Sequence, residues 1–135
     1  MWNEKDLVLG SPDADHLHEV WGVVAHYIED AIPDSSTTSI QQLFGEVLAG
    51  MYQLWVITHH EQAVGALLLE VQGTTTDIVY LGGVQFDQWG PLLMLQLEQH
   101  ARDAGMTQMR ICGRAGWSKL FRDYKEQTRI IAKQL

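Results

Sequence analysis

The sequence predicts a single α/β (α+β) domain over residues 1–135, built on a mixed β-sheet. The chain has 135 residues, of which 46% are hydrophobic and 19% are charged, and this balance suits one compact domain with a sizeable core. Apolar residues recur at helical spacing in some segments and in short strand-like runs in others. An antiparallel meander is expected first and crossover units after it, so parallel and antiparallel pairs should share one sheet.

The first part of the chain predicts a short strand and two helices. The strand covers residues 7–9, and the next helix starts at 11–13, where a proline suits the first turn. Its apolar positions share one helical face: Leu17, Val20, Trp21, Val24, Ile28, Ala31 and Ile32. A second helix begins near Thr38, where Thr38 and Gln41 have the spacing of a capping box, and Gly50 is placed to end it.

The remaining elements follow from the same periodicities and from turn residues. They are strands at 52–58, 63–71 and 78–84, a helix at 91–104, a strand at 106–112, a helix from 116 to about 127 and a closing strand at 128–135. Residues 59–62 are the expected hairpin turn between the first two of these strands. The expected order is therefore β-α-α-β-β-β-α-β-α-β.

Charge and cysteine content limit the function classes. The formal net charge is −8, which weighs against direct nucleic-acid binding and favours other protein chains as partners. Cys112 is the single cysteine, so neither a disulfide framework nor a thiolate metal cluster is expected. With no signal sequence and no apolar run long enough to span a bilayer, we expect a soluble product that is cytoplasmic at synthesis.

Residues 85–105 are the most informative segment, because a strand here leads through a glycine into a helix, an arrangement that presents backbone N–H groups to phosphate. The segment and the element order resemble the GNAT superfamily of acetyl-CoA-dependent N-acetyltransferases. In that resemblance Gln85, Gln88 and Gly90 take the first, middle and last positions of the cofactor motif. The resemblance implies a coenzyme A loop formed by Gln85, Gln88, Trp89 and Gly90.

The chain departs from the cofactor motif in three ways that predict weaker cofactor binding. Gln88 replaces a glycine that would let the main chain approach a pyrophosphate. Pro91, expected at the first helical position, removes one N–H donor from the helix start. No lysine or arginine lies between Gln62 and Arg102 to balance phosphate charge.

The acid and base of an acyl transfer are also in question. In the family a tyrosine of the last helix protonates the departing thiolate, and Phe121 takes that position here. Phenylalanine has no proton to donate, so Tyr124, about one helical turn further on, becomes the candidate acid. Glu70 and Asp77 are the candidate bases, and Tyr80 lies on the same strands.

A closer resemblance is to small GNAT-like proteins encoded in tailed-phage genomes. It is carried by Gln53-Leu54-Trp55, by Gly82-Gly83 with Asp87-Gln88-Trp89, and by Gly113-Arg114-Ala115-Gly116-Trp117. The resemblance implies a phage protein that uses the fold without the reaction, with the virion as one place where it acts. Trp89, Arg114 and Trp117 are then candidate interaction residues, although core packing or structural ion pairing is the competing interpretation of each.

No metal site is expected. His16 and His18 are two residues apart and lie on different faces of a helix, and His59 and His60 lack a nearby third ligand at a recognised spacing.

Two functions of different class remain. The first is a non-catalytic structural or interaction protein with no cofactor. The second is an acetyl-CoA-dependent N-acyltransferase that acts on an amine, so enzymatic activity stays open.

Overall fold

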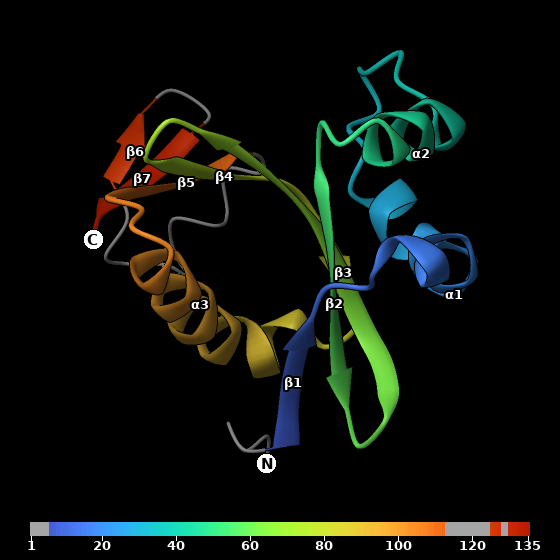
Figure 1. Cartoon of the computed structure of the whole chain (residues 1–135), viewed down its shortest axis with the longest axis horizontal. Helices are drawn as coiled ribbons and strands as arrows, with labels where there is room; N and C mark the ends of the chain where they lie inside the picture. Colours follow the sequence, from blue (N-terminus) through green and yellow to red (C-terminus); the bar gives the residue numbers. More distant parts are fainter. Residues whose placement is uncertain (1–5, 113–124, 128–129) are drawn as a thin grey trace.

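The computed structural model describes residues 6–112, 125–127 and 130–135, arranged around a curled mixed sheet (Figure 1). Its elements are β1 (Leu7–Gly10), a 3₁₀ turn η2 (Ala14–His16), α1 (Leu17–Asp30), α2 (Ile40–Leu48), β2 (Gln53–His59), β3 (Gln62–Gln72), β4 (Thr75–Gly83), α3 (Phe86–Asp103), β5 (Gln108–Cys112), β6 (Lys125–Gln127) and β7 (Ile130–Gln134). The strand order is β1-β2-β3-β4-β5-β7-β6. Among the described strands only the β4–β5 pair is parallel, which confirms the predicted mixed sheet.

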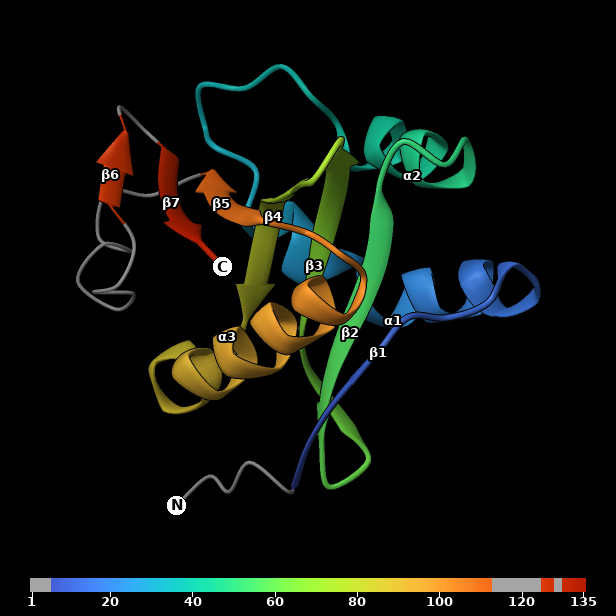
Figure 2. The ribbon, with the colours of Figure 1, turned by 60° about the vertical axis from the view of Figure 1, so that its left-hand side comes forward.

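The sheet carries a separate apolar core on each face. Helices α1 and α2 cover one face and α3 covers the other, as Figures 1 and 2 show. The core under α3 includes Trp89, Leu93 and Leu97, and the core under α1 and α2 includes Trp21 and Ile28. None of the described helices combines the length and the apolar character that a bilayer-spanning helix needs.

The starts of the first two helices differ from the predictions. Residues 11–13 do not begin α1, because Asp13 instead caps the short η2 turn, where its side chain accepts a hydrogen bond from the His16 N–H. The cap of α2 is Ser39, not Thr38, and its Oγ accepts from the Gln42 N–H at 3.0 Å. Gly50 follows the helix end with φ of +82°, as predicted.

The C-terminal part differs from the prediction of a helix that reaches about residue 127. Residues Lys125–Gln127 form β6, which pairs antiparallel with β7. The rest of the predicted helix lies outside the described residues. The secondary structure of Lys125–Gln127 is set by cross-strand pairing with β7, which local helical periodicity does not reveal.

Two ion pairs connect elements that are distant in sequence. Arg110 on β5 binds the buried Asp77 on β4 through two contacts, Nε to Oδ1 at 2.6 Å and a terminal guanidinium nitrogen to Oδ2 at 2.8 Å. Lys133 on β7 binds the buried Glu98 on α3 at 2.8 Å. The first pair bridges the single parallel strand contact, and the second attaches α3 to the C-terminal hairpin.

Candidate functional site

The candidate site lies where β4 separates from β5. Their parallel register runs from Thr75 opposite Gln108 to Ile78 opposite Ile111. Val79–Gly83 then continue β4 without a partner in β5 among the described residues. Within the described part of the chain, the edge of β4 that faces β5 therefore has backbone groups there that can form strand-like hydrogen bonds with a ligand.

A β-bulge accounts for the change in direction of β4. Leu68 of β3 pairs with Tyr80, but the next residue, Leu69, pairs with Ile78, so Val79 has no partner in β3. A bulge bends its strand and increases the local twist. Because the bulge comes directly after the last residue that pairs with β5, it turns β4 away at that point.

The unpaired part of β4 leads into the N-terminus of α3. Gln85 adopts the left-handed conformation, with φ of 56° and ψ of 37°, and the helix begins at Phe86. The Gln88 N–H donates to the Gln85 carbonyl at 2.9 Å. A left-handed residue followed by helical residues directs successive N–H groups towards one point, which suits an anion.

The early start of α3 corrects the prediction that the helix begins at Pro91. Pro91 lies inside the helix, so it removes no donor from the first turn. Its missing N–H instead removes the bond that residue 91 would donate to the carbonyl four residues earlier. The N–H groups of Phe86 and Asp87 in the first turn are therefore unaffected by the proline.

Trp89 anchors this first turn in the core. Its side chain is fully buried, and its indole N–H donates to the Val84 carbonyl at 2.6 Å. Gly65 and Gly83 face each other across β3 and β4, and a Cβ on either would lie 2.7 Å from the indole ring. The two glycines thus create the space that the ring fills. Trp89 is therefore a core residue in this structure rather than a surface anchor.

Gly90 and Gln88 occupy different environments. Gly90 is buried, and a Cβ there would lie 3.0 Å from the ring of Phe86, so the glycine serves ring packing within the helix. Gln88 and Gln85 are exposed. Of the four residues predicted for the cofactor loop, Gln85 and Gln88 are accessible to a ligand, whereas Trp89 and Gly90 are not.

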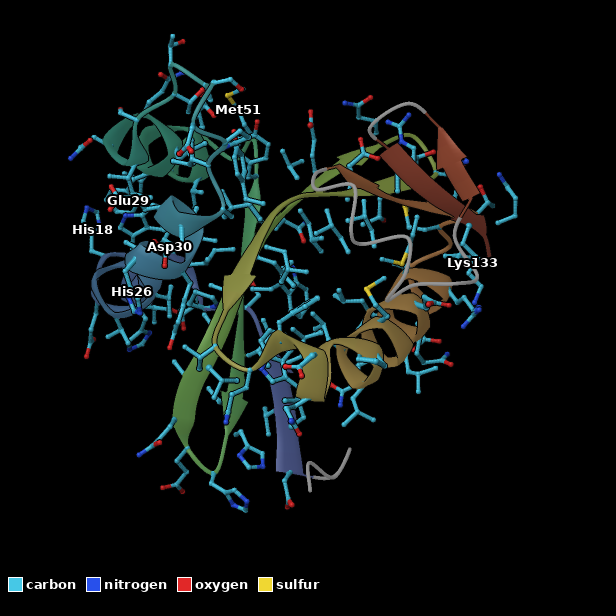
Figure 3. The ribbon with its side chains drawn as sticks, turned by 180° about the vertical axis from the view of Figure 1, so that it is seen from behind. His18, His26, Glu29, Asp30, Met51 and Lys133 are labelled. Carbon is cyan, nitrogen blue, oxygen red and sulfur yellow. The ribbon has the colours of Figure 1, made fainter. Side chains whose placement is uncertain are left out.

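The described residues give the helix start a negative charge. Asp87 is exposed in the first turn of α3, where its carboxylate competes with any bound anion for the N–H groups. From residue 6 to residue 101 the sequence has no lysine or arginine. Lys133 lies beside α3 at the side of the molecule opposite α1, and it is already paired with Glu98 (Figure 3). An anion here would be held by backbone dipoles rather than by these side chains.

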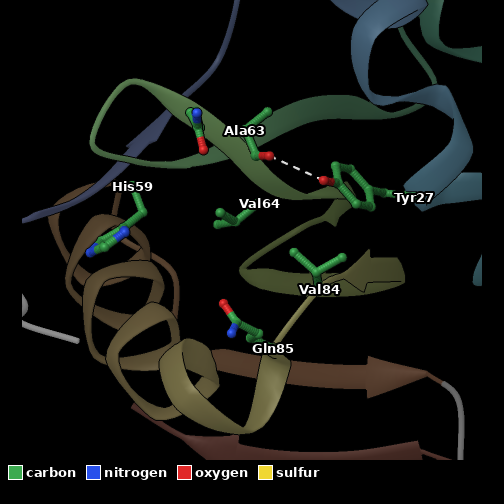
Figure 4. Close-up of a pocket in the computed structure, with 7 residues that line it drawn as sticks. Tyr27, His59, Ala63, Val64, Val84 and Gln85 are labelled. Carbon is green, nitrogen blue, oxygen red and sulfur yellow. Dashed lines mark hydrogen bonds between the residues drawn. The ribbon is translucent and has the colours of Figure 1, made fainter. Parts of the chain in front are cut away.

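A cavity of about 530 Å³ adjoins Gln85. Besides Gln85 it is lined by Tyr27, His59, Gln62, Ala63, Val64 and Val84 (Figure 4). The Tyr27 hydroxyl donates to the Ala63 carbonyl at 3.1 Å, which connects α1 to the start of β3. The cavity is therefore bounded by α1, the β2–β3 hairpin and the junction of β4 with α3.

The two predicted bases lie away from this site. Glu70 and Asp77 face each other across β3 and β4, in the part of β4 that still pairs with β5. Asp77 is held by Arg110, and Glu70 accepts a hydrogen bond from Gln72 at 3.0 Å. The structure gives both carboxylates structural contacts and places neither on the unpaired part of β4.

Tyr80 does lie on the unpaired part of β4. Burial raises the pKa of its phenol, and the nearby Glu46 carboxylate of α2 raises that pKa further, while a hydrogen bond with Thr38 opposes the rise. A phenol with a raised pKa stays protonated at neutral pH, so it can donate a proton but cannot act as a base. Glu46 was missed by sequence reasoning because a lone glutamate on an amphipathic helix gives no sign that it approaches the sheet.

Three predicted residues lie outside the described residues. They are the candidate acid Tyr124 and the candidate interaction residues Arg114 and Trp117. Their roles stay predictions.

Comparison with known proteins identifies the fold. The sequence matches no family model and no curated protein. Solved structures do match over nearly the whole chain. The PaiA N-acetyltransferase from Thermoplasma acidophilum, in complex with coenzyme A, has a TM-score of 0.64 and 11% identity over 96% of this chain and 99% of that one.

Two further solved structures agree with this match. The ribosomal-protein-S18-alanine N-acetyltransferase from Escherichia coli has a TM-score of 0.67 and 15% identity, covering 95% of this chain and 93% of that one. A GNAT family acetyltransferase from Elizabethkingia anophelis with acetyl-CoA bound has a TM-score of 0.67 and 12% identity. The match covers 96% of this chain and 99% of that one. The chain therefore has the GNAT fold, as its sequence predicts.

Proposed function

We propose that this protein binds an acyl-CoA thioester between β4 and β5 and transfers the acyl group to an amine, as an acetyl-CoA-dependent N-acyltransferase. The observation that carries the proposal is the separation of β4 from β5 after Ile78. Backbone groups of Val79–Gly83 can hydrogen-bond to the amides of a pantetheine arm in the way that a strand edge binds an extended peptide. The neighbours of known structure that hold coenzyme A or acetyl-CoA support this choice of ligand.

The pyrophosphate would lie at the N-terminus of α3. The left-handed Gln85 and the first residues of the helix supply converging N–H groups. Asp87 opposes the phosphate charge, so we propose a lower affinity than an uncharged first turn would give.

In the transfer step the amine nitrogen attacks the thioester carbonyl and the carbon–sulfur bond breaks. The amine loses a proton and the departing thiolate gains one. Glu46 is the carboxylate we propose as proton acceptor, because it lies close enough to Tyr80 to raise the pKa of that phenol. Tyr80, which stays protonated, would orient the acceptor as a hydrogen-bond donor.

Changing Asp87 to asparagine is expected to tighten acetyl-CoA binding about 3- to 10-fold at low salt, because one unit charge about 4 Å away costs about 1 kcal/mol in water. Isothermal titration calorimetry of both proteins measures the change. Asp15→Asn removes an exposed charge from η2, away from α3, and is the matched control. Equal affinities for the wild type and Asp87→Asn would contradict the placement of the phosphates.

A second candidate is a non-catalytic role in which the protein binds other chains, for example in a virion of the kind implied by the phage resemblance. The acidic first turn of α3 and the burial of Gly90, both unfavourable to a cofactor loop, favour it. It predicts no calorimetric signal with millimolar acetyl-CoA for the wild type or for Asp87→Asn, whereas the first candidate predicts saturable binding.

A further inference from the structure

We propose that Asp6, His59 and His60 form a binding site for a transition-metal cation, with Zn²⁺ as the ion that the donor set fits best. One ligand atom from each residue lies within 4.8 Å of the other two. The Nε2 atom of His60 is 3.8 Å from a carboxylate oxygen of Asp6. Asp6 is thus the nearby third donor that the sequence spacing of the two histidines did not indicate.

The strand pairing explains why residues so far apart in sequence meet. β1 pairs antiparallel with β2, and Leu7 lies opposite His59. The residue before Leu7 therefore lies beside the residue after His59, which brings Asp6 next to His60. His60 and Glu61 form the hairpin turn, with φ of 50° and 66°. Two positive values are typical of the tight hairpin turn that joins β2 to β3 and sets the register of those two strands.

The chemistry of the three donors suits zinc. Two imidazole nitrogens and one carboxylate oxygen are ligands that Zn²⁺ accepts at about 2.0–2.1 Å, so tetrahedral ligand atoms lie about 3.4 Å apart. The 3.8 Å contact is close to that spacing, and small rotations of side chains on a turn would close the others. Three protein ligands leave a fourth position for water or another ligand.

The surroundings favour a bound cation. The chain has a net charge of −8, and Lys5, next to Asp6, is the single lysine or arginine before Arg102 in the sequence. His59 also lines the 530 Å³ cavity, so an ion held by it would lie at the edge of that cavity (Figure 4). The ion would also join the short edge strand β1 to the β2–β3 hairpin, and a ligand that binds only the folded state stabilises that state.

The test uses the full chain, treated with a chelator and then titrated with zinc sulfate alone, so its outcome is independent of acetyl-CoA. Calorimetry is expected to show one zinc equivalent, and differential scanning fluorimetry a higher melting temperature with zinc. Co²⁺ in place of zinc is expected to give the visible absorption of a four-coordinate site.

Three substitutions test the ligands one at a time: Asp6→Asn, His59→Gln and His60→Asn, the last keeping a residue that tolerates positive φ. Each is expected to weaken zinc binding at least about 10-fold, by analogy with the cost of altering metal-site residues. His26→Gln, an exposed histidine of α1 on another part of the molecule, is the control and should bind zinc as the wild type does. Unfolding curves in the absence of metal establish that the variants are folded. Wild-type affinity in any of the three variants, or absence of a stoichiometric site in the wild type, overturns the proposal.

Discussion

Replacing Trp89 with alanine is expected to lower the free energy of unfolding by about 3–5 kcal/mol, the range for truncating a buried large aromatic side chain. The indole is fully buried against Gly65 and Gly83, and its ring contacts Phe86 edge-to-face at a centroid distance of 5.0 Å. Truncation leaves a cavity between α3 and the sheet, and it also removes the hydrogen-bond donor to the Val84 carbonyl. Urea denaturation followed by circular dichroism measures the loss.

Two further variants separate the effect of the lost ring volume from that of the lost hydrogen bond and from a general effect of truncation on α3. Trp89→Phe keeps part of the ring volume but leaves the Val84 carbonyl without its donor, so it should destabilise less than the alanine variant. Leu95→Ala removes an exposed apolar side chain from the same helix and should change stability by less than about 0.5 kcal/mol. A loss below about 1 kcal/mol for Trp89→Ala would show that the ring does not fill the core.

Replacing Arg110 with methionine is expected to destabilise the protein by about 3–5 kcal/mol, the cost of leaving a buried charge without its partner. Asp77 is buried, and both of its oxygens receive hydrogen bonds from the guanidinium. The pair also spans β4 and β5 just before they separate. Thermal and urea unfolding measure the effect.

The partner substitution is expected to have a smaller effect. Asp77→Asn leaves a guanidinium whose side chain is 30% exposed, so water can solvate much of the remaining charge. A double-mutant cycle of the two variants isolates the interaction between them. If Asp77→Asn lowered the free energy of unfolding more than Arg110→Met does, burial of an unpaired carboxylate would not explain the loss of stability in Arg110→Met.

The element types were predictable from the sequence wherever local signals agree with the tertiary contacts. The hairpin of β2 and β3 was predicted from its two flanking apolar runs, although Glu61 is not a typical residue for positive φ. The apolar face of α1 was predicted from helical spacing, and Trp21, Val24 and Ile28 are indeed buried. Gly50 ended its helix as expected.

The site was harder to predict because long-range packing decides it. A proline suggested that the helix starts at residue 91, but burial of Trp89 fixes the first turn at Phe86. The available signal was the pair of strand glycines, Gly65 and Gly83, since glycine in a strand often marks the close approach of another group. Asp6 and His60 meet only through strand register, which no local pattern encodes.

The expectation that no cofactor binds depended on Gln88, on Pro91 at the helix start and on the lack of lysine and arginine between Gln62 and Arg102. The described residues retain the two features that a thioester carrier would use, the β4 edge that has no β5 partner after Ile78 and the N–H groups that follow Gln85. Asp87 and the missing basic residues affect the strength of binding, and they leave those two features in place.

The most direct test is an NMR titration of the ¹⁵N-labelled protein with acetyl-CoA. We predict that the largest shifts fall on the backbone amides of Val79–Gly83 and on those of Phe86, Asp87 and Gln88, and that they saturate together. Absence of shifts at millimolar acetyl-CoA, or shifts confined to residues away from these two segments, would contradict binding of acetyl-CoA between β4 and β5 and at the start of α3.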